Sequence, residues 1–183
     1  MRLTELSTDR LRLEPAASSH ATGLFPLFDN WKVARWLSGP EWPQSPGLFD
    51  AWLQRTMAAN AEGREATFVL LHDSRPIGVV GVNQRRGARN LGYWLGEPYW
   101  NRGFMSEAAA TLLRWFFAAP DHYFIVSGAI EGNGPSLRIQ RRLGFIEVGE
   151  SGVKSRPLDR RLPHIDTLLG RERWQAIISR SEL

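Results

Sequence analysis

The feature that most constrains the fold of this chain is a change of hydrophobic period close to residue 100. Before it, short runs rich in apolar residues occupy 66–72, 77–82 and 91–95, with only brief polar turns between them. Such runs predict three consecutive antiparallel strands. After it, the apolar residues of 105–118 recur at helical spacing, so we expect a helix to follow the third strand closely.

The rest of the chain adds elements on both sides of this region. Helices are expected over 16–28, 48–60, 135–143 and 171–180, and strands over 10–13, 123–130, 145–148 and 165–169. The tryptophan-rich segment Trp31–Trp42 is punctuated by proline, which predicts a loop. We see no internal repeat or low-complexity tract. The pattern predicts a single mixed α/β (α+β) domain over residues 1–183, with one sheet flanked by helices.

Composition limits the classes of protein that remain. The chain has 183 residues, enough for one full core, and its 43% hydrophobic and 23% charged residues are ordinary for a globular protein. No apolar run approaches the ~20 residues of a membrane span, and the first residues lack an apolar signal core, so we expect a cytoplasmic protein. The absence of cysteine excludes disulfides, thiolate metal sites and a cysteine nucleophile, and no metal site is expected.

The net charge of +4 leaves two interpretations open. Only Lys32 and Lys154 are lysines, so nearly all of the positive charge is arginine. A GC-rich genome would favour arginine codons. Arginine also binds phosphate through a planar fork of donors. Charge of this size suits a phosphorylated cofactor as well as a nucleic acid, and it does not decide between them.

The most informative stretch is Gly92–Ala108, where a strand ends, an irregular turn follows and a helix opens near Gly103. Backbone N–H groups at the start of a helix are unpaired, and the helix dipole favours phosphate oxygens there. Gly103 lets a pyrophosphate approach the backbone, and Arg102 adds charge. The alternative is a plain turn with Trp100 in the core. The stretch is neither a P-loop nor the dinucleotide fingerprint, because the lysine and the glycines of those motifs are missing.

Two ordered motifs carry a family resemblance. Tyr99–Ala108 resembles the acetyl-CoA pyrophosphate loop of the GNAT superfamily, and it looks most like the branch of ribosomal-protein N-terminal (alanine/serine) acetyltransferases. Asn133–Phe145 is similar to that family's Asn-x-x-Ser helix, which ends in Leu-Gly-Phe. Thr8–Leu13 and Ile165–Leu169 also resemble this branch. The likeness covers nearly the whole chain and is weakest from about residue 29 to 64.

The resemblance implies a GNAT fold, in which a mixed, mostly antiparallel sheet splays between the strand at 93–95 and the strand at 125–130. The pantetheine arm of acetyl-CoA would lie in this V-shaped gap. The residues implied at the cofactor are Trp94, Leu95 and Gly96 along the pantetheine, Asn101, Arg102, Gly103, Phe104, Met105 and Ser106 around the pyrophosphate, and Asn133 on the pantetheine chain. Asn101 departs from the usual glycine, but asparagine tolerates the left-handed backbone conformation.

For catalysis, the resemblance implies that the hydroxyl of Ser136 can hydrogen-bond the CoA sulfur; the alternative is a plain helix residue. The amide of Leu95 is a candidate oxyanion donor. Relatives often carry a glutamate before the strand at 91–95, where Asn90 stands here, or near the position of Ser155. The general base is left open among Glu97, Glu131, Glu150, His164, Asp166 and water.

The acceptor pocket is expected between residues 29–60 and the loop 149–163. Trp36 and Trp52 are expected to pack helices onto the sheet, whereas Trp42, between a glutamate and a proline, is harder to place in the core. Arginines in the second loop argue mildly against a polycationic acceptor such as an aminoglycoside.

Three functions remain open. The chain acetylates a protein N-terminus, such as that of a ribosomal protein; or it acetylates a small amine or antibiotic; or it is a non-catalytic acetyl-CoA-binding or RNA-binding module. The RNA-binding function would need Arg85, Arg86 and Arg89 to form one basic face with Arg141 and Arg142. Nucleic acid is not the favoured partner, and a homodimer is compatible with the resemblance.

Overall fold

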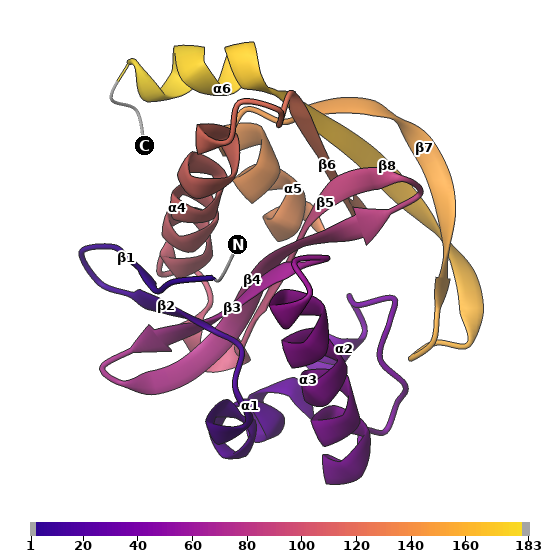
Figure 1. Cartoon of the computed structure of the whole chain (residues 1–183). Helices are drawn as coiled ribbons and strands as arrows, with labels where there is room; N and C mark the ends of the chain where they lie inside the picture. Colours follow the sequence, from indigo (N-terminus) through magenta and orange to yellow (C-terminus); the bar gives the residue numbers. More distant parts are fainter. Residues whose placement is uncertain (1–2, 181–183) are drawn as a thin grey trace.

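One eight-stranded sheet organises the computed structural model, which describes residues 3–180 (Figure 1). Its strands are β1 Leu6–Ser7, β2 Arg12–Pro15, β3 Ala66–His72, β4 Arg75–Arg85, β5 Ala88–Leu95, β6 Phe124–Ile130, β7 Ile146–Ser155 and β8 Arg160–Gly170. They lie in the order β1-β2-β3-β4-β5-β6-β8-β7, and each neighbouring pair is antiparallel except β5 and β6. The expected mixed, mostly antiparallel sheet is confirmed.

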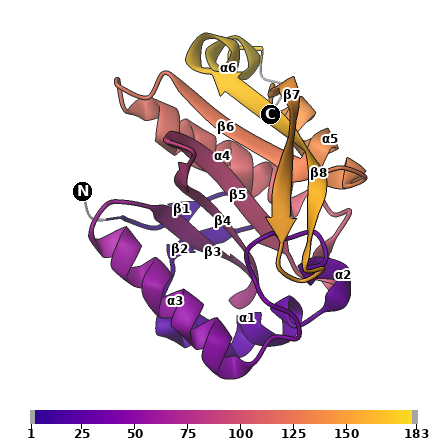
Figure 2. The same cartoon turned by 90° about the vertical axis from the view of Figure 1, so that its right-hand side faces the viewer.

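Helices cover both faces of this sheet (Figures 1 and 2). They are α1 Ala21–Phe28, α2 Trp31–Ala34, α3 Pro46–Ala61, α4 Phe104–Ala118, α5 Gly134–Arg142 and α6 Arg171–Ile178, with single 3-10 turns at Ser18–His20 and Glu97–Tyr99. Within the described residues, none of these helices has the length and apolar character needed to cross a membrane.

The core is divided by the sheet into two clusters. Fully buried Leu112 and Phe116 of α4 pack against Val80 of β4 on one face. On the other face, Phe49 and Leu53 of α3 pack with α1 and with residues of β3 to β5. Since side chains alternate across a strand, each central strand supplies both clusters and is nearly all apolar. This double burial fixes the middle of the sheet between two layers of helices.

The sheet opens between its two parallel strands. The described chain has one register pair between β5 and β6, Asn90 with Val126. Beyond it the strands diverge, and only the hydroxyl of Ser127, which donates to the carbonyl of Leu91 at 2.9 Å, still bridges them. The gap therefore begins at Leu91 and widens toward the end of β5, as the resemblance implied.

Some boundaries differ from those predicted. The first long strand spans residues 12–15 rather than 10–13, because Thr8 and Arg10 are held by α4 instead. β4 and β5 continue through the predicted turn 85–90 and are joined at Arg86 and Gly87, both in the left-handed region, which is the hairpin turn that matches strand twist. The predicted strands 145–148 and 165–169 are parts of the longer β7–β8 hairpin, so the expected loop 149–163 is mostly strand. Much of β7 is exposed and lacks an apolar signal.

Candidate active site

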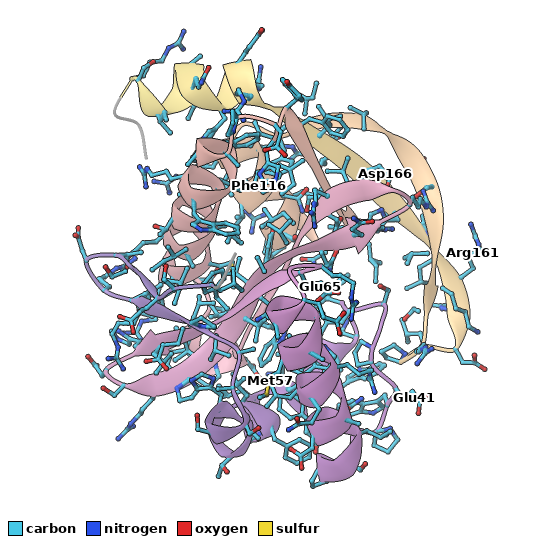
Figure 3. The ribbon with its side chains drawn as sticks, in the orientation of Figure 1. Glu41, Met57, Glu65, Phe116, Arg161 and Asp166 are labelled. Carbon is cyan, nitrogen blue, oxygen red and sulfur yellow. The ribbon has the colours of Figure 1, made fainter. Side chains whose placement is uncertain are left out.

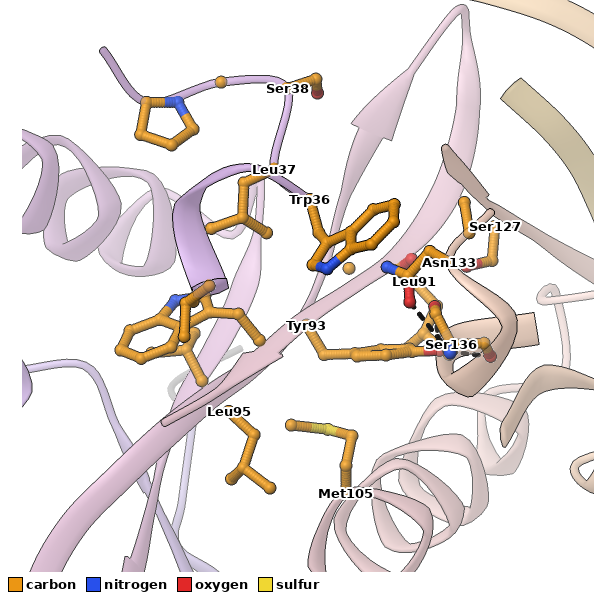
Figure 4. Close-up of a pocket in the computed structure, with 18 of the residues that line it drawn as sticks. Trp36, Leu37, Ser38, Leu91, Tyr93, Leu95, Met105, Ser127, Asn133 and Ser136 are labelled. Carbon is orange, nitrogen blue, oxygen red and sulfur yellow. Dashed lines mark hydrogen bonds between the residues drawn. The ribbon is translucent and has the colours of Figure 1, made fainter. Parts of the chain in front are cut away.

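A cavity of about 1030 Å³ lies where β5 and β6 part (Figure 4). On one face of the sheet it is lined by the starts of α4 and α5, and on the other by the end of β4, by His164 in the middle of β8 and by α3. The lining residues that matter most below are Gly103, Ser106, Asn133 and Ser136 on the first face, and Asn83, Arg85 and His164 on the second. The gap in the sheet thus joins two half-sites into one cavity.

The loop before α4 has the backbone expected of an anion site. Asn101 and Gly103 lie in the left-handed region, with φ of 58° and 79°. Gly103 is the residue before the first turn of α4 and no side chain caps this end, so the first N–H groups of the helix are left for another acceptor. Phe104, Met105 and Ser106 of that turn line the cavity. The structure therefore presents an uncapped helix start to the cavity.

The N-terminal segment holds this loop in place. Thr8 donates to the carboxylate of Glu107 in the first turn of α4, and Arg10 Nε donates to the same carboxylate at 2.7 Å. Arg10 also donates to the carbonyl of Arg102 at 3.0 Å and lies 4.7 Å above the ring of Phe104. Burial alone would raise the pKa of Glu107, but the hydrogen bonds from Thr8 and Arg10 outweigh it and lower the pKa. The side chain of Arg102 is exposed and does not line the cavity.

The backbone of β5 shows which groups are turned toward the gap. Because the carbonyl of Leu91 accepts from Ser127 of β6, the polar groups of Leu91, Tyr93 and Leu95 point toward β6. The carbonyl of Leu95 already accepts from the indole of Trp100 at 2.7 Å. Tyr93 and the amide of Leu95 are therefore turned toward the gap.

Two of the three residues expected to pair with pantetheine are oriented differently. Gly96 donates its N–H to Ile77 of β4 at 2.9 Å and accepts from Tyr99 at 3.0 Å, so both of its backbone groups are used within the protein. Gly96 also lies outside the cavity lining. The backbone of Trp94 is turned toward Val79 of β4, although its side chain lines the cavity. Alternate residues of a strand direct their backbone groups to opposite neighbours, so Trp94 and Gly96 face β4 while Leu95 faces the gap.

Ser136 lies in the first turn of α5, at the edge of the gap (Figure 4). Asn133 caps this helix, since its side-chain oxygen accepts from the N–H of Ser136 at 3.3 Å. The hydroxyl of Ser136 is 2.9 Å from the hydroxyl of Tyr93, which reaches across the gap from β5. Both Asn133 and Ser136 therefore stand where the first half-site meets the opening of the sheet.

Gln140 fixes the orientation of Ser136 from one turn further along α5. Its amide nitrogen donates to the carbonyl of Gly128 at 3.1 Å and to the hydroxyl of Ser136 at 3.2 Å. Its amide oxygen accepts from Thr167 of β8 at 2.7 Å. A carbonyl only accepts, so the Gly128 contact sets which end of the fully buried amide is the nitrogen.

This network can leave one hydroxyl proton, that of Ser136, available to a group in the cavity. Burial raises the pKa of Tyr93 against the opposing effect of its hydrogen bonds, so the phenol stays protonated at neutral pH. Its contact with Ser136 Oγ at 2.9 Å is shorter than the 3.2 Å contact with the Ser136 carbonyl. When Tyr93 donates along the shorter contact, Ser136 Oγ accepts from both Tyr93 and Gln140 and keeps its own proton for a group in the cavity.

Comparison with known proteins identifies the family. A sequence profile described as the Acetyltransferase (GNAT) domain matches residues 10–146, which include the loop before α4 and the Asn133–Ser136 turn. The match covers well over half of the chain. The chain belongs to the GNAT acetyltransferase family. The resemblance carried by the two motifs is thereby confirmed, as is the expectation of an N-acetyltransferase.

The relatives of this GNAT protein include ribosomal-protein acetyltransferases. The ribosomal-protein-serine acetyltransferase of Escherichia coli is 24% identical over 148 residues, which is 78% of this chain and 82% of that protein. The crystal structure of the ribosomal-protein-S5-alanine acetyltransferase from Vibrio fischeri superposes with a TM-score of 0.77 at 21% identity, covering 93% of this chain and 98% of that one. The microcin C7 self-immunity acetyltransferase MccE, solved with acetyl-CoA and AMP, gives 0.78 at 18% identity, covering 89% and 94%.

The GNAT structure separates the candidate bases. Glu97 is bound to Lys32 and Asn30, whose hydrogen bonds lower its pKa, and it does not line the cavity. Glu131 and Glu150 are exposed and lie outside the lining. Ser155, near the position where relatives often carry a glutamate, is buried and also lies outside it.

His164 is the candidate that reaches the cavity. It is buried, with 5% of its surface exposed, and it lines the second half-site. Its Nδ1 is 2.8 Å from the carboxylate of Asp166, and its Nε2 is 3.1 Å from Nη1 of Arg85 on β4. His164 and Asp166 are two residues apart on β8, so they share a face of the strand, and the structure places them in contact. Arg85 as their partner could not be read from the sequence.

The tryptophans fall into different environments. Trp52 of α3 stacks on Phe28 and packs in the second core cluster, as expected. Trp36 is only partly buried and lines the cavity, so it is not simply a packing residue. Trp42 packs against Trp31, with ring centroids 5.4 Å apart. Part of the 29–60 segment therefore forms a wall of the cavity.

The β7–β8 hairpin meets this wall at its tip. The backbone N–H of Arg156 donates to the carbonyl of Ser38 at 3.1 Å, and its guanidinium lies 3.6 Å from Glu41. Arg156 is the residue of 149–163 that lines the cavity. The expected second wall is thus a contact at the hairpin tip rather than a broad loop.

Four of the five arginines proposed as a basic face are used in contacts within the protein, and the fifth, Arg142, is exposed and lines the cavity. Arg85 points into the cavity toward His164, Arg141 pairs with Glu147 at 2.6 Å, and Arg89 donates to the carbonyl of Arg64 at 2.9 Å. Arg86 lies 3.8 Å from Asp166. Over residues 3–180, no three His, Asp or Glu side chains gather in a group able to hold a metal ion.

Proposed function

We propose that this GNAT protein transfers the acetyl group of acetyl-CoA to a primary amine at a protein N-terminus, with both substrates bound at once. The observation that carries the proposal is the single cavity that passes through the gap between β5 and β6. It has an anion-binding helix start at one end and a buried polar half-site at the other. Acetyl-CoA and nascent or ribosomal proteins are cytoplasmic, so the proposal places the enzyme there as one domain.

The first half-site fits the phosphates of acetyl-CoA. The N–H groups at the start of α4 and the left-handed Asn101 and Gly103 form a concave anion site. A side chain at Gly103 would place a Cβ 3.3 Å from Arg10, which shows how closely the loop is packed around this point. MccE, a structural neighbour, was solved with acetyl-CoA. When bound, acetyl-CoA supplies the activated thioester.

Residues of the chain would act on the thioester from the first face. Ser136 turns its hydroxyl proton toward the cavity, where it can donate to the departing sulfur. The amide of Leu95 is turned toward the gap, where it can stabilise the oxyanion. Because the chain has no cysteine, it offers no thiol for an acetyl-enzyme intermediate, which favours direct transfer.

The acceptor would enter from the second face. The E. coli relative is named for a ribosomal-protein serine, and the V. fischeri neighbour for an alanine of ribosomal protein S5. Asn83 and Asn90 line this half-site and can bond the peptide groups that follow an N-terminal amine. Arg156 and Ser38 both line the cavity and are hydrogen-bonded to each other, so they close part of its wall; this observation favours the second candidate, a small amine.

The test is a CoA-release assay with acetyl-CoA and a panel of short peptides that begin with serine, alanine, threonine or methionine, beside spermidine and kanamycin. We expect turnover with at least one peptide, and mass spectrometry should find one added acetyl group at its N-terminus. Double-reciprocal plots of the initial rates should give intersecting lines, as transfer in a ternary complex requires. Turnover confined to spermidine or kanamycin would support the small-amine function instead. Acetyl-CoA binding without turnover of any amine would contradict the proposal and favour a non-catalytic module.

A further inference from the structure

We propose that His164, held by Asp166, is the residue that takes the proton from the acceptor amine, and that Arg85 covers its free nitrogen until the acceptor arrives. The inference rests on the proposed acetyl transfer, and it assigns the base that the sequence left open. Its evidence is the geometry on the second face of the sheet, away from Ser136. Asp166 lies at the top of this face beside the β4–β5 hairpin (Figure 3).

The partners of His164 fix its tautomer. The carboxylate of Asp166 can only accept, so the 2.8 Å contact puts a proton on Nδ1. The guanidinium of Arg85 can only donate, so the 3.1 Å contact leaves Nε2 with its lone pair. A protonated Nε2 would face Arg85 donor to donor. The imidazole is therefore neutral in this arrangement, with its basic nitrogen at the cavity.

The surroundings of His164 keep it neutral. Burial lowers its pKa, the positive charges of Arg85 and Arg86 lower it further, and Asp166 opposes them without reversing the shift. The strand residues packed beside the ring bring no other charge: Gly128 and Ile130 on β6, and Ser151 on β7. Because its pKa is lowered, His164 is neutral at pH values at which an ordinary histidine is protonated. Its Nε2 can therefore accept a proton from the amine.

His164 and Ser136 lie on opposite faces of the sheet, and Gly128 of β6 lies between them. A Cβ on Gly128 would lie 2.3 Å from the His164 ring, so the imidazole packs directly against the backbone of β6 at the gap. The carbonyl of that same Gly128 accepts from Gln140, which bonds Ser136 on the other face. An acceptor nitrogen and a leaving sulfur that meet in the gap would thus have a base on one side and a donor on the other.

The proposed step conserves bonds, electrons and protons. The amine lone pair forms the bond to the acetyl carbon, the carbon–sulfur bond breaks, and its electron pair leaves on sulfur. Nε2 of His164 takes the proton that the nitrogen loses and passes it to water. Ser136 hydrogen-bonds the thiolate, which takes its proton from water. Arg85 leaves Nε2 as the amine enters, and it is then free to bond an acceptor carbonyl oxygen.

The first experiment is chemical rescue. In His164→Ala, we expect kcat/KM to fall by about 100-fold or more with the peptide that wild type acetylates fastest. Added imidazole should restore part of that rate. Calorimetric affinity for acetyl-CoA should stay within about twofold, because the substitution lies on the other face of the sheet. His122→Ala is the matched control, since His122 lies outside the cavity lining, and its rate should not respond to imidazole.

A second variant tests the orientation of the ring. Asp166→Asn removes the carboxylate that holds the proton on Nδ1, so kcat should fall by about tenfold or more. Imidazole should not rescue it, because His164 still fills the site. If the pair had only a structural role, both variants would lose stability, and imidazole would not rescue His164→Ala any better than Asp166→Asn.

The outcomes separate the two proposals. A wild type active on peptides together with a fully active His164→Ala, or a rate loss that imidazole does not relieve, would overturn the assignment of the base and leave the acetyl transfer standing. A wild type that turns over no amine would overturn both.

Discussion

At Gly103, a single backbone angle joins the loop to the helix. Its φ of 79° is costly for any residue with a side chain, and the nearest heavy atom to an added Cβ belongs to Arg10. The same position borders the uncapped N–H groups of α4. Conformation and ligand approach therefore both require a residue without a side chain at this point.

We predict that Gly103→Glu weakens acetyl-CoA binding by about 100-fold or more, since it adds bulk and negative charge at the phosphate site. Isothermal titration with acetyl-CoA measures this. Gly63→Glu is the matched control, because Gly63 has a similar φ of 71° but nothing close to an added Cβ and no place in the cavity lining. Equal affinity in the two variants would show that the phosphates bind elsewhere.

Tyr93 is a second residue whose role depends on one atom. We predict that Tyr93→Phe lowers kcat by about tenfold, the value of a hydrogen bond of ~1.4 kcal/mol, because Ser136 is then free to turn its proton away from the cavity. Acetyl-CoA affinity should hold. Tyr123→Phe removes the hydroxyl of a residue that is 71% exposed and should leave kcat unchanged. An unchanged kcat in Tyr93→Phe would rule out the orienting role.

At the scale of elements, the segment before β2 acts as a clamp on the start of α4. Thr8 and Arg10 reach Glu107, which explains why a motif at the N-terminus accompanies a loop nearly one hundred residues later. Glu107 in the first turn also complements the helix dipole. The Arg10–Glu107 ion pair thus fixes the loop on the side away from the cavity.

The clamp predicts a pH-dependent stability. The folded pKa of Glu107 is lowered, so its contribution is present above its unfolded pKa of 4.5 and is lost as pH falls through the folded pKa. Glu107→Gln should cost about 1 kcal/mol of unfolding free energy at pH 7, because the ion pair is partly exposed. Urea unfolding at pH 7 and pH 3.5 measures this, and the difference from wild type should shrink at the lower pH. A constant difference would mean that the carboxylate charge is not the source.

At the scale of the whole molecule, the acceptor half-site is bounded by segments distant in sequence. The tip of the β7–β8 hairpin meets the loop after α2 through Arg156, Ser38 and Glu41. Both segments belong to the parts of the chain whose patterns are least informative. Ser38, Glu41 and Arg156 all line the cavity, so their contact forms part of its wall.

We predict that Arg156→Glu raises the KM of the acceptor about threefold to fivefold, because two like charges then face each other at the rim. Acetyl-CoA affinity should not change, and steady-state kinetics with each substrate varied separates the two. Arg160→Glu makes the same charge change at an exposed residue outside the cavity lining. If Arg160→Glu raised the KM of the acceptor equally, the cause would be the overall charge and not the contact at the rim.

The amino-acid sequence alone determined the elements that form the half-site proposed to bind acetyl-CoA. The three strands, the helix that follows them and the loop at Asn101–Ser106 are local patterns, in which period and backbone preference act over a few neighbouring residues. Gln140, one turn after Ser136 on the same helix face, was within reach of the same reasoning. Trp94 and Gly96 were assigned without the strand alternation that turns their backbones toward β4.

Only the tertiary structure decided the acceptor half. His164, Asp166 and Arg85 come together because the hairpin β7–β8 brings one strand beside β6 while β4 ends across the gap. No periodicity in the sequence records contacts between residues nearly eighty positions apart. The loop at Asn101–Ser106 and the change of period near residue 100 could be read from neighbours along the chain. The site of the proposed base, His164, depends instead on which strands lie side by side.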